Sequence, residues 1–185
     1  YMFWGCTALT SVPEMDTSNV TNMNNMFQNC TVLTSVPEMD TSNVTLMSHM
    51  FRGCTNLTSI DVSNWNTGSV KNFGSLFRLC HKLASLDVSN WDTSSATDMS
   101  YLFNECQAIN GLNVSGWDVS NVTNMRYVFY DCESLTAVNA SNWDVGNVTD
   151  VSNMFYTCNA LTSLDVSNWD VSEITDMTGL FYNCE

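Results

Sequence analysis

The chain has 185 residues, of which 44% are apolar, so its length and composition fit a single domain with a core. Nineteen acidic residues outnumber five basic ones and give a net charge of −14 at pH 7. This balance argues against nucleic acid and anionic membrane surfaces as partners, because both need a basic surface. No apolar run is long enough to span a membrane, and no basic and apolar leader opens the sequence.

The cysteines divide the chain into repeats. They recur at intervals of 24, 24 and then five times 26 residues, at Cys6, Cys30, Cys54, Cys80, Cys106, Cys132, Cys158 and Cys184. We therefore predict one repeat array over residues 1–185, made of about seven units. A unit this small cannot bury its own apolar face and has to stack on copies of itself. The chain opens in mid-unit with YMFWGC and shows no polar cap. We therefore expect a fragment of a longer array, whose uncapped ends allow self-association.

The first two units are shorter than the others. Each contains SVPEMDTSNVT, at residues 11–21 and 35–45, which includes the two prolines of the chain. Met15 and Met39 take the place that tryptophan has in later units. The prolines fall where a strand would end, a position that tolerates a missing N–H group.

From Cys54 onward the units are regular. Each opens with Leu-x-x-Leu-x-Val, and its alternation, as in Ile60-Asp61-Val62, predicts a short half-buried strand. A tryptophan and a polar turn follow. Each unit then ends with Met-x-x-Leu-Phe-x-x-Cys, as in residues 99–106. Its spacing of three and four predicts one or two helical or 3₁₀ turns. Stacked units would form a parallel sheet along one side of the array.

These motifs resemble those of a known family. Leu-x-x-Leu-x-Val with a period near 25 resembles the leucine-rich repeat, and Phe129-x-x-Cys132-x-x-Leu135 is similar to the BspA-like subclass of bacterial surface proteins. The motif VSNWD…NVTDM is similar to that of a variant of this subclass. The resemblance implies a curved solenoid with strands on the concave side and helical or 3₁₀ turns on the convex side. It also implies an extracellular or cell-surface location and a role in adhesion.

Two columns of side chains are predicted to form structural ladders. The cysteine column is interpreted as buried free thiols, with disulfides between neighbouring units as the alternative. The tryptophan column is interpreted as buried, with an exposed stripe for sugar stacking as the alternative. The residues of the two ladders are Cys30, Cys54, Cys80, Cys106, Cys132, Cys158, Trp65, Trp91, Trp117, Trp143 and Trp169.

Two rows of polar residues are candidates for function. The first alternates with core positions and should project from the concave face; it comprises Asp61, Asp87, Asn113, Asn139 and Asp165, with Ser63 and Ser89 beside it. It is either a binding face or a solvated strand face. The second row follows tryptophan, at Asp92, Asp118, Asp144 and Asp170. It is interpreted as Asx turns, with calcium bridging as the alternative.

No residues assemble into a catalytic or metal-binding pattern. The sequence has no C-x-x-C, no G-x-S-x-G and no glycine-rich phosphate loop, and its two histidines lie far from ligand spacing. Four of the N-x-T matches arise from one repeat position, which is interpreted as a turn residue. We predict a non-enzymatic scaffold without a cofactor or metal, which binds a basic, host or matrix protein. The alternatives are a stalk or fibre and a phage attachment protein.

Overall fold

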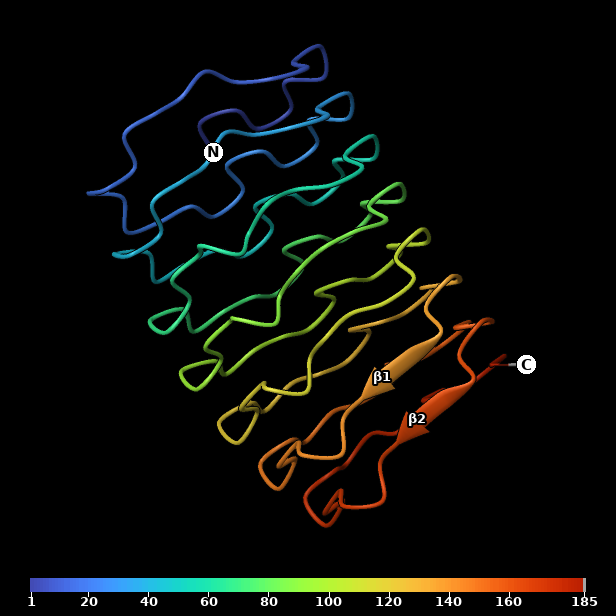
Figure 1. Ribbon diagram of the computed structural model, residues 1–185. Coiled ribbons are helices and arrows are strands. Elements are labelled where there is room, and N and C mark those ends of the chain that lie inside the picture. The colour runs from blue at the N-terminus through green and yellow to red at the C-terminus, as the bar shows by residue number, and fades with distance from the viewer. Residues whose placement is uncertain (185) are drawn as a thin grey trace.

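Each repeat unit forms one coil, and the coils stack along a single direction. The computed structural model describes residues 1–184. Figure 1 shows the chain running from the N-terminal coil at one end of the stack to the C-terminal coil at the other. Parallel bridges join equivalent residues of successive coils at Asn22, Leu46, Asn72, Asp98, Asn124, Asp150 and Asp176. The repeat fold predicted from the cysteine spacing is therefore confirmed.

Within residues 1–184, strands form in fewer coils than the sequence predicted. In residues 1–184 they are β1 (Ala137–Asn139) and β2 (Ser163–Asp165), which pair in parallel with Val138 opposite Leu164. Both fall in the predicted Leu-x-x-Leu-x-Val segment, as does the single bridge between Ser59 and Ser85. The ladder that runs through Asn22 to Asp176 was not predicted, because its polar residues lack the apolar alternation that indicates a strand.

The helical or 3₁₀ turns predicted for the Met-x-x-Leu-Phe-x-x-Cys segment are absent, and residues 1–184 contain no helix. Two consecutive β-turns, with a third turn that overlaps both, occupy the segment instead. In residues 99–106 the two outer turns close with Leu102 N–H donating to Met99 O at 3.2 Å and Cys106 N–H donating to Phe103 O at 3.0 Å, and the middle turn closes with Asn104 N–H donating to Tyr101 O at 3.2 Å. We call this segment of each coil the double turn.

A left-handed residue at the third position of each outer turn explains why no helix forms. Tyr101 has φ 60° and Glu105 has φ 61°, as expected at the third position of a type II turn. This geometry directs alternate N–H groups out of the coil. Tyr101 N–H donates to Arg126 O at 2.9 Å, and Glu105 N–H donates to Tyr130 O at 2.7 Å, both in the next coil. The motif spacing resembles that of a helix, but its backbone hydrogen bonds join neighbouring coils.

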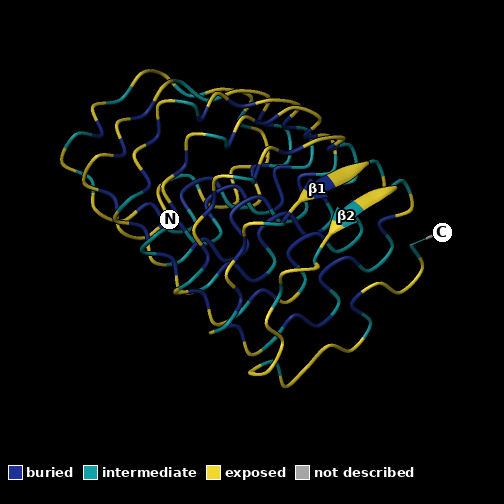
Figure 2. Ribbon diagram, turned by 60° about the horizontal axis from the view of Figure 1, so that its bottom comes forward, coloured by how far each residue is buried: buried dark blue, intermediate teal, exposed yellow. Residues whose placement is uncertain are grey.

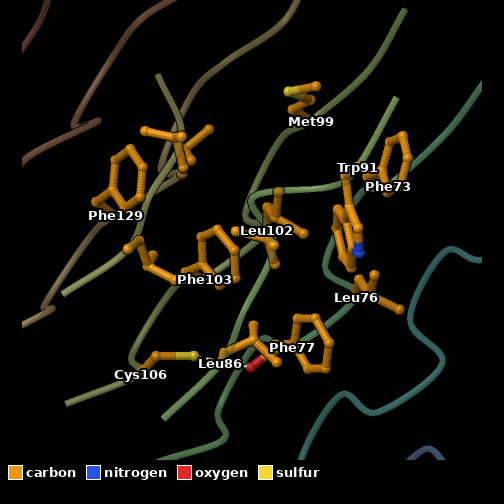
Figure 3. Packing of buried hydrophobic residues seen from close by; sticks show 14 of the residues in the cluster. Phe73, Leu76, Phe77, Leu86, Trp91, Met99, Leu102, Phe103, Cys106 and Phe129 are labelled. Atoms are coloured by element: carbon orange, nitrogen blue, oxygen red, sulfur yellow. Dashed lines mark hydrogen bonds between the residues drawn. The ribbon is translucent and has the colours of Figure 1, made fainter. Parts of the chain in front are cut away.

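Aromatic side chains fill the centre of the stack. One phenylalanine column runs through all the coils, with neighbouring ring centroids 5.3–6.0 Å apart, at Phe3, Phe27, Phe51, Phe77, Phe103, Phe129, Phe155 and Phe181. Figure 3 shows part of this column beside Trp91 and Cys106. Figure 2 shows the buried residues on the inside of the coils and the exposed ones on the outer bends. The centre of the stack is thus built on a column of one residue type in register.

Candidate interaction surfaces

The cysteine column lies in the core as free thiols. Six of its members, Cys30 to Cys158, are fully buried. Each Sγ–H donates to a phenylalanine carbonyl of the preceding coil, as from Cys80 to Phe51 O at 3.2 Å and from Cys106 to Phe77 O at 3.1 Å. Burial raises the pKa of Cys54 and of Cys158 to about 12. The folded protein therefore holds these groups as neutral thiols, which are poor nucleophiles.

The tryptophan column is also internal. Trp65, Trp91, Trp117 and Trp143 are at most 4% exposed, whereas Trp169 in the last coil is partly exposed. Neighbouring indole centroids lie 6.1–6.4 Å apart. From Trp91 onward the indole Nε1–H donates to a carbonyl of the preceding coil, as from Trp143 to Val114 O at 3.1 Å. Because these rings are stacked and buried, the indoles of Trp65 to Trp143 offer no face to a sugar.

The first polar row lies on the outside of the coils. Asp61, Asp87, Asn113, Asn139 and Asp165 are all exposed, and Asn139 is paired with Asp165 across β1 and β2. Ser63 and Ser89 lie beside it and are partly exposed. Each aspartate accepts hydrogen bonds at Oδ1 from the serine two residues on, as Asp87 does from Ser89 Oγ at 2.6 Å and Ser89 N at 3.0 Å.

These serine contacts keep the aspartates of the row ionised by lowering their pKa values. The Ser89 hydroxyl and N–H bonds hold the pKa of Asp87 below its usual range, although the charge of Asp61 opposes this shift. The Ser63 bonds lower the pKa of Asp61 in the same way. Within residues 1–184, the second carboxylate oxygen of Asp61, Asp87 and Asp165 makes no hydrogen bond. The row therefore presents ionised oxygens to solvent on the neighbouring coils of Asp61 and Asp87, and again at Asp165, three coils further along.

The second acidic row forms Asx turns. Asp92 Oδ1 accepts from Ser94 N at 3.0 Å and Ser94 Oγ at 2.6 Å, and Asp118 accepts from Ser120 at the same distances. Asp170 and Asp144 accept backbone N–H groups from Ser172 and Gly146. No group of three or more metal-ligating side chains occurs within residues 1–184.

The turn position that carries the N-x-T matches bonds to the preceding coil. The amide of Asn121 donates to Ser94 O at 2.9 Å, and that of Asn147 donates to Ser120 O at 2.7 Å. Asn43 donates to Ser18 O at 2.8 Å in the same way. The side-chain nitrogen that a glycan would occupy therefore takes part in coil stacking.

A pocket lies in the short units, beside the methionines that take the place of tryptophan. It has a volume of about 520 Å³ and is lined by Glu14, Met15, Glu38, Met39, Asp40 and Asn64. Glu38 Oε1 accepts from Asn64 Nδ2 at 3.1 Å. Met39 is buried in the position that indole occupies in later coils, and the smaller side chain leaves the space open.

The surface of the double turn was not predicted from the sequence. Two of its positions differ from coil to coil, unlike the phenylalanine column, and are at least partly exposed in most coils, although Ser75 and Asn104 are buried. One position carries Asn25, His49, Ser75, Tyr101, Tyr127, Asn153 and Gly179; another, three residues later, carries Gln28, Arg52, Arg78, Asn104, Tyr130, Tyr156 and Tyr182. We call these side chains and Arg126 the double-turn face. It contains all three arginines and five of the six tyrosines of the chain.

The tyrosines of this face stack on one another. Ring centroids lie 4.7 Å apart for Tyr101 and Tyr127, 4.9 Å for Tyr130 and Tyr156, and 4.6 Å for Tyr156 and Tyr182. The ring faces between these coils are therefore occupied by neighbouring tyrosines. Variation between units at periodic positions was the sequence signal that could have revealed this surface.

Comparisons with known proteins place the chain in a family. The family model described as "Mycoplasma protein of unknown function, DUF285" matches residues 1–112 and 80–185. The chain belongs to this family. The two DUF285 matches overlap at residues 80–112, and each covers several of the stacked coils.

Other comparisons show weaker likeness. This DUF285 chain is similar to a leucine-rich repeat protein from Bacteroides ovatus, whose crystal structure it matches with 15% identity and a TM-score of 0.31. The match covers 95% of this chain and 72% of the other. No curated protein matches the chain. Within residues 1–184 we find no helix that could cross a membrane.

Proposed function

We propose that the chain is a non-enzymatic protein-binding scaffold of leucine-rich-repeat type, displayed on a cell surface or secreted, and that it functions in adhesion. Its binding surface is the first polar row, which takes a partner with basic side chains. The observation that carries the proposal is the exposure of this row on successive coils, with one carboxylate oxygen of Asp61, Asp87 and Asp165 turned to solvent.

The physical support is the regular spacing of these charges. Coils that pair in parallel lie about 4.8 Å apart, so the row repeats its carboxylates and amides at that interval. The stacked core holds them in place, which lowers the entropy lost on binding. A basic segment of a partner would meet several carboxylates at once and gain attraction that one exposed ion pair cannot supply.

The row can be neutralised without breaking its turns. Asn113 and Asn139 already occupy two positions, and each accepts from its serine hydroxyl at 2.8 Å, so Asp→Asn retains the turn. The test measures binding of a lysine-rich peptide to the wild type and to the triple variant Asp61→Asn, Asp87→Asn, Asp165→Asn. The control is Asp92→Asn, Asp118→Asn, Asp170→Asn, which removes equal charge from the second row.

We expect the first-row variant to bind at least tenfold more weakly and the second-row variant to stay within about twofold of the wild type. Equal losses in both variants would mean that only net charge matters, and would contradict a dedicated row. Surface display is tested separately, by labelling intact cells with an antibody against the chain; labelling only after lysis would contradict it.

The second candidate is a structural stalk or fibre. The close similarity of neighbouring units along the first polar row favours it, because a dedicated binding face usually differs between units. Electron microscopy of the purified protein distinguishes the two functions. Filaments built from coils stacked end to end would support the fibre, and discrete particles at all concentrations would support the scaffold.

A further inference from the structure

A cluster of basic side chains lies on the double-turn face, in two neighbouring coils. His49 and Arg52 belong to the same turn, which Arg52 N–H closes by donating to His49 O at 3.1 Å. Gly53 N–H donates to Arg78 O at 2.7 Å, which places Arg78 in the next coil beside Arg52. All three side chains are partly exposed, so a ligand from solvent can reach the exposed part of each.

Two buried nitrogen atoms in this cluster have no hydrogen-bond partner in the protein. They are His49 Nδ1 and Arg52 Nε, and within residues 1–184 no other buried side-chain nitrogen or oxygen atom lacks a partner. Leaving such an atom unbonded costs about 1–3 kcal/mol, and more when the group is charged. That both belong to one cluster marks it as the part of residues 1–184 where the chain's own groups leave buried nitrogen atoms unsatisfied.

The arginines of this face also lack ion pairs within residues 1–184. Although the chain carries nineteen acids, no carboxylate within residues 1–184 forms an ion pair with Arg52, Arg78 or Arg126. Burial and then the charge of Arg78 lower the pKa of Arg52. Burial, Arg52 and Arg78 also lower the pKa of His49, against the opposing charge of Asp98. The two guanidinium groups thus repel each other, and an anion between them would relieve that repulsion.

One guanidinium group is already fixed in position. Arg78 Nε donates to the buried Asn104 Oδ1 at 2.9 Å, and its Cζ lies 4.8 Å from the ring centroid of Tyr101. The Cζ of Arg126 lies 5.4 Å from the same ring, so Tyr101 contacts two guanidinium groups. Fixing Nε in this way leaves the terminal amino groups of Arg78 for a ligand and lowers the entropic cost of binding.

We propose that His49, Arg52 and Arg78 form a binding site for a tetrahedral oxyanion of the phosphate or sulfate type. A planar carboxylate matches a single guanidinium fork, whereas here the donors come from two coils and a histidine. The oxygens of a tetrahedral anion point in several directions and can meet donors from both coils. The site shares no residue with the first polar row, so this proposal can be tested independently of the proposed adhesion function.

The test measures binding of inorganic sulfate and inorganic phosphate by isothermal titration calorimetry and by thermal melting, with chloride used to keep the ionic strength constant. The variants are Arg52→Gln and Arg78→Gln. The control is Lys71→Gln, which removes the same charge from an exposed position outside the cluster. We expect saturable binding by the wild type, at least tenfold weaker binding by each arginine variant, and a change within twofold for the control.

A second readout does not rely on the arginine variants folding normally. The chain has two histidines, so the imidazole signals of the wild type can be followed by NMR during the sulfate titration. We expect the signals of His49 to shift and those of His81 to stay in place. Absence of saturable binding, equal weakening by Lys71→Gln, or equal shifts of both histidines would overturn the proposal.

A further comparison identifies the source of the anion. A sulfated dextran oligosaccharide is titrated against inorganic sulfate at equal sulfate concentration. Tighter binding of the oligosaccharide would support an oxyanion carried by an extended partner, which also reaches Arg126. Equal affinity would support a free ion at the same site. In both cases Arg52→Gln must weaken binding, and its failure to do so would overturn the site.

Discussion

The inside of the coils and the double-turn face use the same repeat in opposite ways. Inside, the phenylalanine column keeps one residue type in eight successive positions, and every ring stacks on the next. On the double-turn face, equivalent positions change from glutamine to arginine, asparagine and tyrosine. Stacking in register therefore restricts which residues the core can hold, whereas the double-turn face can vary from coil to coil and acquire a specific binding site.

The largest expected effect is alkaline unfolding caused by the cysteine column. A thiol whose pKa rises from 9.0 to about 12 on folding, as for Cys54 and Cys158, contributes stability that is fully present below pH 9. Above pH 9 the unfolded thiol loses its proton first, so the free energy of unfolding falls by about 1.4 kcal/mol per pH unit for each such thiol until the folded pKa is reached.

Denaturant unfolding at pH 7, 9 and 10 measures this slope. The variant Cys54→Ala, Cys158→Ala should be less stable at pH 7 but should lose less stability between pH 9 and pH 10. Identical losses in the variant and the wild type would show that these thiols do not titrate on unfolding.

The next effect comes from the phenylalanine column. Phe103 is fully buried between Phe77 and Phe129, with centroid distances of 6.0 and 5.8 Å. Phe103→Ala should lower the free energy of unfolding by about 3–5 kcal/mol, because it leaves a cavity in the stack. The matched control on the double-turn face is Tyr156→Ala, which should cost less than the core substitution. A loss below about 1 kcal/mol for Phe103→Ala would contradict the assigned interior.

A moderate loss of stability is expected at a buried position that carries threonine in one coil and valine in the next. Thr93 is buried and its Oγ1 donates to Asp118 O at 2.8 Å, while the equivalent residue of the next coil is the buried Val119. Thr93→Val should destabilise by about 1 kcal/mol, the net value of one such hydrogen bond. Thermal or urea unfolding measures it. A loss above about 3 kcal/mol would mean that the hydroxyl holds the coil together.

The smallest effect is expected in the first polar row. Asp87→Ser removes an exposed carboxylate beside Asp61, and serine can form a similar though weaker turn. The change in unfolding free energy should be under about 0.5 kcal/mol, as for most surface substitutions. A large loss would show that the row is structural, and would also weaken the case for it as a binding face.

The sequence predicted the repeat fold, because equivalent residues recur every 24 or 26 positions. It also predicted which side chains of each strand face the core, because apolar and polar residues alternate there. It misassigned the double turn, because a spacing of three and four fits both a helix and two consecutive turns. What distinguishes them is the left-handed backbone at residues such as Tyr101 and Glu105, which are not typical of that conformation. The basic cluster was missed because His49, Arg52 and Arg78 become neighbours only when two coils stack.

The most direct test of the account is a count of reactive thiols under non-reducing conditions, first on the native and then on the unfolded protein. The account predicts that the six buried cysteines, Cys30 to Cys158, do not react in the folded state, while the exposed Cys6 and the partly exposed Cys184 do. All eight should react after unfolding. Few or no additional thiols on unfolding would mean that disulfides join the coils, and rapid reaction of all eight in the native state would contradict the stacked core.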